Sequence, residues 1–248
     1  MKKTNIEKLT ELREKAYELS KTYPTKIALE FKTLYHEDLQ RLKASEDYRE
    51  SMTQGRVRRE DKLRDKYTKL LFESIAEQKA EYAEIYKEAT KLAKTLQTTP
   101  HAKPSDDLTF KLFEQELQSL QTSTMLGANA TRSIEAIDAF IGKYGDDPYF
   151  ASIIKDNFVQ LSQNVLSIEA TMQNRQALSR VLERVEQKAT SEEQAVAAET
   201  LAAFGDGNPT FFIPGLAQHN AISTIIGKRH AEFLDKPTEW LESQEQAE

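Results

Sequence analysis

Residues 56–97, RVRREDKLRDKYTKLLFESIAEQKAEYAEIYKEATKLAKTLQ, contain neither glycine nor proline, so nothing in them interrupts a helix. Apolar side chains recur there at alternating steps of four and three residues, the spacing of a heptad seam. Gln78 is the one polar interruption, and the seam consists of Leu71, Ile75, Tyr82, Ile85, Ala89, Leu92 and Leu96. The helix would be about 63 Å long. A helix of that length with so narrow a stripe needs a partner along most of it.

Two shorter helices are predicted before this stretch. Thr4 and Glu7 have the spacing of a capping box, and the helix that follows should end at Pro24, which lacks an amide hydrogen. A second helix is predicted over about residues 25–44, and residues 45–55 should form a turn. These helices can fold back on residues 56–97 as an antiparallel hairpin, or a second copy of the chain can supply the partner. The sequence leaves both arrangements open.

The remainder of the chain also carries helical stripes. A helix is predicted over about 106–123 with Ser105 as its N-cap, and residues 148–189 can form one long helix. A further helix should follow a capping pair at Thr190 and Glu193, and a last one is predicted over about 216–234. Only residues 210–215, TFFIPG, read as extended chain. We therefore predict three parts: a charged helical arm over 1–97, a linker over 98–107 with two prolines, and a helical bundle over 108–248.

The composition agrees with an all-α protein. The chain has 248 residues, of which only 8 are glycine and 7 proline, fewer turn residues than a β-sandwich or doubly wound fold usually needs. It has no cysteine, which excludes disulfides, thiolate metal sites and a cysteine nucleophile. No apolar run approaches the roughly 18 residues of a membrane span, and the N-terminus lacks an apolar signal core. We expect a soluble, cytoplasmic protein that is made without export and has no membrane partner.

Charge is distributed unevenly. Residues 1–99 hold 22 basic and 18 acidic side chains, whereas residues 100–248 hold 12 and 22. The basic side chains are densest over residues 55–69, where the net charge is +4 and where Arg56, Arg58 and Arg59 stand close together. Contact with nucleic acid or an acidic protein surface is the alternative function that this run suggests. Its ordinary explanation is a solvated helix face with charges of both signs.

No constellation in the sequence indicates catalysis, a metal or a cofactor. His36 and Glu37 resemble the start of a zincin motif, but the second histidine one turn later is missing. Residues 205–208, GDGN, lack the further ligands of a calcium loop and the lysine of a phosphate loop. We therefore predict no catalytic residue, no metal ligand and no cofactor, and we expect a protein that is not an enzyme.

Phe211 and Phe212 lie in the loop-like segment 210–215, and their large side chains must be buried somewhere. Burial against the chain's own bundle is one expectation. Docking of this segment into a groove of a partner protein is the other.

The order of these segments resembles minor structural or assembly proteins of tailed bacteriophages. The likeness lies in the charged stretch over 46–96, EDYRESMTQGRVRREDKLRDKYTKLLFESIAEQKAEYAEIYKEATKLAKTL, followed by a bundle that contains YGDDPYFASII at 144–154. The resemblance implies an interaction role, either in scaffolding a head or as part of the virion, with protein partners or self-association. It implies host cytoplasm or the virion as the location, and no catalytic residues.

Overall fold

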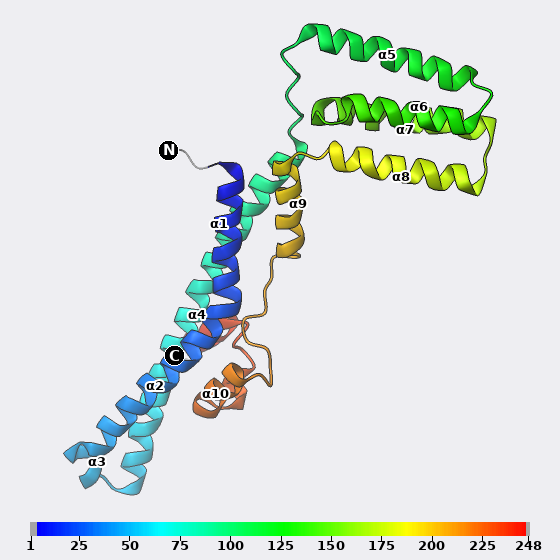
Figure 1. Ribbon diagram of the computed structural model, residues 1–248. Helices are drawn as coiled ribbons and strands as arrows, with labels where there is room; N and C mark the ends of the chain where they lie inside the picture. The colour runs from blue at the N-terminus through cyan, green and yellow to red at the C-terminus, as the bar shows by residue number, and fades with distance from the viewer. Residues whose placement is uncertain (1–3, 247–248) are drawn as a thin grey trace. The chain divides into compact units, whose positions relative to one another are not determined.

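The computed structural model describes residues 4–246, and within that range the regular structure is helical, without a strand (Figure 1). The predicted all-α class is confirmed. None of the helices in this range has the length and apolar content that a membrane crossing requires.

The chain divides into two compact units that differ from the predicted parts. Unit 1 comprises Met1–Ala93 together with Glu199–Glu248, and unit 2 comprises Lys94–Ala198. The predicted boundaries at residues 97 and 108 therefore differ from the observed ones, which fall after Ala93 and after Ala198. The physical reason is that large apolar side chains after residue 199 pack against the N-terminal helices instead of joining the bundle. Each unit has a hydrophobic core of its own.

Unit 1 begins with α1 (Asn5–Tyr17), and the predicted capping box of Thr4 and Glu7 is present. The predicted helix end at Pro24 is wrong. A π-helical turn, Glu18–Thr22, leads directly into α2 (Tyr23–Ala44), where Pro24 occupies the first turn. The Tyr23 amide donates to the Glu18 carbonyl five residues back. Proline has no amide hydrogen to give, so a wider turn just before it keeps the chain helical.

The predicted turn over 45–55 contains a short helix, α3 (Glu46–Glu50), after which α4 (Thr53–Thr98) runs for 46 residues. Three contacts show how α2 lies on α4: the Tyr23 and Ser74 hydroxyls are 2.9 Å apart, the Tyr67 hydroxyl donates to Asp38 over 2.7 Å, and Lys43 pairs with Glu60 at 3.4 Å. Positions that rise along α2 fall along α4, so the two helices are antiparallel (Figure 1).

The C-terminal part of unit 1 completes its core. It consists of the end of α9 (Glu192–Phe204), α10 (Ala217–Ile226), α11 (Lys228–Ala231) and α12 (Pro237–Glu245). The side chains that it adds to the core of α2 and α4 are Phe204, Phe211, Phe212, Ile222, Ile225, Ile226, Leu234 and Trp240. The Trp240 ring stacks on Phe72 of α4 with centroids 4.2 Å apart. The predicted helix over 216–234 ends instead at Gly227, whose φ of 87° favours glycine.

Unit 2 contains α5 (Asp107–Leu126), α6 (Ala130–Tyr144), α7 (Pro148–Ile168) and α8 (Met172–Lys188), and it also includes the beginning of α9. Phe113 of α5 is fully buried and meets the rings of Phe140, Tyr144 and Phe150 at centroid distances of 4.6 to 5.5 Å. Apolar side chains from four helices thus surround one aromatic centre.

Several predicted helix ends in this region are corrected. Asp106, not Ser105, caps α5 by accepting from the Leu108 amide. Thr171 caps α8, so residues 148–189 form two helices. The capping pair before α9 is Ser191 with Gln194, one residue later than predicted. Residues 210–215 form turns and no strand.

Candidate interaction surfaces

The predicted seam of α4 is covered by the chain itself. Leu71, Ile75, Tyr82, Ile85 and Leu96 are buried, and Leu92 is half-buried. The first four belong to the core of unit 1, where the neighbouring side chains come from α2 and from the segment after residue 204. Leu96 lies in the part of α4 that belongs to unit 2. The seam is therefore not an exposed surface in this conformation.

The basic run at the start of α4 is partly engaged within the chain. Arg56 donates from Nε to the Tyr48 carbonyl over 3.1 Å and from its guanidinium to the Arg49 carbonyl over 2.6 Å, at the end of α3. Arg59 pairs with Asp47 at 3.8 Å, whereas Arg58 is exposed. Cations favour the carbonyl end of a helix, so Arg56 holds α3 against α4. Arg56 and Arg59 thus both contact α3.

Phe211 and Phe212 are 2% and 1% exposed, so neither offers a surface to a partner. Phe211 contacts the rings of Tyr23 and Tyr82 at 6.3 and 6.2 Å. The core that receives them is that of unit 1, whereas burial in the C-terminal bundle was expected. Their backbone amides donate to the Asp235 carboxylate over 2.7 and 3.2 Å. Lys79 of α4 pairs with the same carboxylate at 3.3 Å and thereby ties the segment to α4.

An exposed apolar surface that the sequence reading missed lies on α5. Leu108, Leu112 and Leu126 are 67%, 46% and 75% exposed. Leu108 and Leu126 are eighteen residues apart, which is five full helical turns, so they lie on one line along the helix. The exposed residues between them on this line, Gln115, Ser119 and Thr122, carry no charge. We call this set the outer face of α5.

A hollow of about 410 Å³ lies at the C-terminal end of the outer face. Its lining includes Ser119, Thr122 and Leu126. The steps from Leu108 through Leu112, Gln115, Ser119 and Thr122 to Leu126 alternate between four and three, which the sequence already displays. Because the middle positions of this pattern are polar, it is weaker than the buried apolar pattern on the same helix, which consists of Phe113, Leu117 and Leu120.

His230 and Trp240 form a hydrogen bond that depends on pH. The Trp240 indole donates from Nε1 to Nδ1 of His230 over 2.8 Å, so this nitrogen must be unprotonated. Burial of the imidazole lowers the pKa of His230 below its usual range, and the nearby Arg229 and Arg64 act in the same direction against Asp65. The folded state therefore favours the neutral ring.

We expect unit 1 to lose stability as the pH falls below about 6.5, the usual pKa of histidine in an unfolded chain. The unfolded state takes up the proton first, and the folded state takes it up only at lower pH by giving up the Trp240 hydrogen bond. Urea unfolding followed by Trp240 fluorescence between pH 7.5 and 5.5 measures the effect. His230→Gln, whose amide oxygen can still accept, should show a smaller pH dependence. Equal slopes for both proteins would contradict the assignment.

Among residues 4–246, no three side chains of the histidine, aspartate and glutamate type are grouped closely enough to hold a metal ion. Comparisons with protein-family models, with curated proteins and with solved structures found no match to this chain. Function must therefore be inferred from the surfaces of the molecule.

Proposed function

We propose that this chain is a non-enzymatic structural protein that acts through protein–protein contacts, and that the outer face of α5 is its contact surface. The observation that carries the proposal is the exposure of Leu108, Leu112 and Leu126 along one side of a regular helix. Isolated exposed leucines are common, whereas apolar residues that recur along one helix face are typical of surfaces that pair with another helix.

The outer face fits a second copy of itself. Residue 117 is the midpoint between Leu108 and Leu126, so an antiparallel copy of α5 would set each of these leucines opposite the other one. Such a contact is isologous, with the same patch on both chains, as most symmetric dimers require. Ser119 near the centre is small enough for close approach, and the uncharged line brings no like charges together.

The proposed role extends to the rest of the chain. In this role α4, with α1 and α2 packed along part of it as a coiled-coil-like hairpin, serves as a spacer, and the helical bundle of unit 2 serves as the anchor. The 46-residue length of α4 supports the spacer. The resemblance to minor structural or assembly proteins of tailed bacteriophages supports a place in a virion or in its assembly.

Light scattering coupled to size exclusion tests the contact surface in the full chain. We expect a dimer whose fraction rises with concentration, and a monomer for the double variant Leu108→Glu/Leu126→Glu, because four buried carboxylates per dimer would lack partners. Val159→Glu is the matched control, since Val159 is 66% exposed on α7 and should leave the dimer intact. A wild-type monomer at all concentrations, or a dimer that survives the double variant, would contradict the proposal. Circular dichroism checks that each variant is folded.

A further inference from the structure

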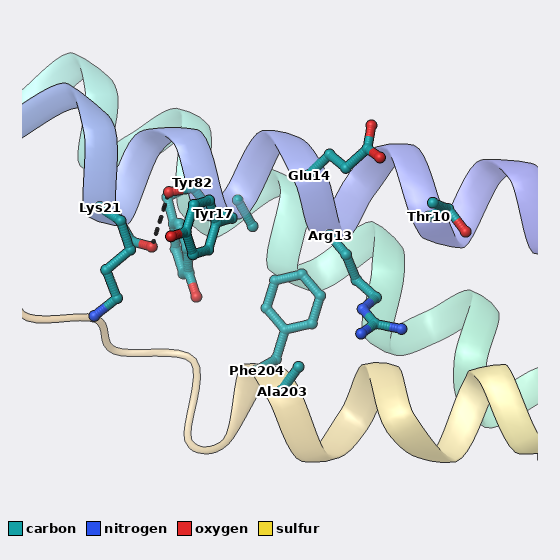
Figure 2. A pocket seen from close by; sticks show the side chains of 10 residues that line it. Thr10, Arg13, Glu14, Tyr17, Lys21, Tyr82, Ala203 and Phe204 are labelled. Atoms are coloured by element: carbon teal, nitrogen blue, oxygen red, sulfur yellow. Dashed lines mark hydrogen bonds between the residues drawn. The ribbon is translucent and has the colours of Figure 1, made fainter.

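Unit 1 contains a cavity of about 530 Å³ between α1, the π-helical turn, α4 and the end of α9 (Figure 2). Its volume falls within the range of small-molecule sites. The cavity shares no residue with the outer face of α5, which belongs to unit 2. It is therefore a separate feature from the proposed protein contact.

The apolar part of this cavity is aromatic. Tyr82 of α4 and Phe204 of α9 line it, with ring centroids 6.2 Å apart and ring planes at 61°. Ala16 and Ala203 also line it and leave room beside the rings. Flat apolar groups pack well against the faces and edges of such rings. The lining thus favours a ligand with an aromatic portion.

The charged part of the cavity is cationic on the side of the rings. Figure 2 shows Arg13 extending toward α9 near Phe204 and Lys21 extending to the same side, whereas the Glu14 carboxylate points the opposite way. Arg13 pairs with Glu199 at 3.3 Å, and its side chain is 36% exposed. Lys21 is exposed, and no ion pair is found for it among the described residues. A cation without a counter-charge beside an apolar surface attracts an anion.

The wall that carries Lys21 is the π-helical turn. Ser20 and Lys21, which line the cavity, both belong to Glu18–Thr22. The Ser20 hydroxyl lies 3.5 Å from the Tyr17 carbonyl oxygen (dashed line in Figure 2). This hydrogen bond is long, so the hydroxyl can also bond to a ligand. Single π-helical turns inside α-helices occur frequently at functional sites. The same turn also accommodates Pro24, and it places Ser20 and Lys21 on the wall of the cavity.

From the aromatic lining and from Lys21 beside it, we infer that this cavity binds a small organic anion with an aromatic ring. The ring lies against Tyr82 and Phe204, and the anionic group contacts Lys21, whereas the Arg13 guanidinium is paired with Glu199. The chemical class is an aryl carboxylate or aryl sulfonate.

Isothermal titration calorimetry of the full chain with naphthalene-2-sulfonate tests the inference. We expect saturable one-to-one binding with a dissociation constant below about 1 mM. The neutral analogue 2-naphthalenemethanol should bind at least about tenfold more weakly, because it forms no charge-assisted contact. An absence of saturable binding, or equal affinity for both probes, would overturn the assignment of an anion site.

Two pairs of matched variants locate the site. Lys21→Glu should weaken binding of the sulfonate at least about tenfold, whereas Lys26→Glu, the same charge change on an exposed position outside the cavity, should leave it within about twofold. Ala203→Phe fills the cavity from an exposed position and should abolish binding, whereas the exposed neighbour Ala202→Phe should preserve it. Binding by Lys21→Glu and Ala203→Phe that equals that of their controls would overturn the inference.

Discussion

Replacing Phe72 with alanine should lower the free energy of unfolding of unit 1 by about 3–5 kcal/mol, the cost of removing a fully buried aromatic side chain. Phe72 is 0% exposed and its ring stacks on Trp240. The variant therefore leaves a cavity beside α4 and also removes the ring against which Trp240 of α12 packs. Both losses fall on the contact between the N-terminal helices and residues after 199.

Hydrogen exchange measured by mass spectrometry separates the two units in this experiment. We expect faster exchange in peptides from α2, α4 and α10 of Phe72→Ala, with little change in α6 and α7. Leu70→Ala is a suitable control because Leu70 lies on the same helix but is 49% exposed, so it should cost far less. Equal protection of α10 in Phe72→Ala and wild type would contradict the packing of the C-terminal segment on α4.

Replacing Phe113 with alanine should destabilise unit 2 by a similar amount, about 3–5 kcal/mol. Phe113 is 0% exposed, and Phe150 lies 4.6 Å from it between ring centroids. Phe140 and Tyr144 also face it, so one truncation removes several aromatic contacts, each of which contributes beyond the buried area.

The same exchange experiment gives the reciprocal result for Phe113→Ala. Peptides from α6, α7 and α8 should lose protection, while Trp240 fluorescence, which reports on unit 1 because the chain has one tryptophan, should keep its wild-type unfolding midpoint. Val159→Ala, on α7 of the same unit and 66% exposed, is the control. Loss of the Trp240 signal at the same denaturant concentration as unit 2 would contradict two separate cores.

The features that sequence reasoning recovered are local. The capping box of Thr4 and Glu7 and the uninterrupted helix after Arg56 depend on neighbouring residues, so their patterns are visible without the fold. The smaller errors concern helix ends at which neighbouring residues could equally well form the cap. Thr190–Glu193 and Ser191–Gln194 have the same spacing; the capping hydrogen bonds are those between Ser191 and Gln194, and the Thr190 hydroxyl donates to the Glu186 carbonyl instead. Helix α7 ends at Ile168 and Thr171 caps α8, with no glycine or proline between them, so a slip in the apolar register is the only signal of the break.

The features that the sequence did not predict depend on which apolar helix faces pack against one another. Phe211 and Phe212 were recognised as side chains to be buried, but nothing in their own segment says that Tyr23 and Tyr82 would receive them. Asp235 accepts from two amides more than twenty residues away, and such pairing has no periodic signature. The outer face of α5 was hidden because burial, which the sequence does not report, distinguishes it from the inner stripe.

The insertion of Lys94–Ala198 between the two segments of unit 1 has a consequence for synthesis. All of unit 2 leaves the ribosome before the residues that complete unit 1 do, so the inserted bundle can fold first. Until Phe204 to Trp240 emerge, the apolar sides of α2 and α4 that they cover remain open to water. A chain that ends at residue 198 should consequently bind chaperones more strongly than the full chain does.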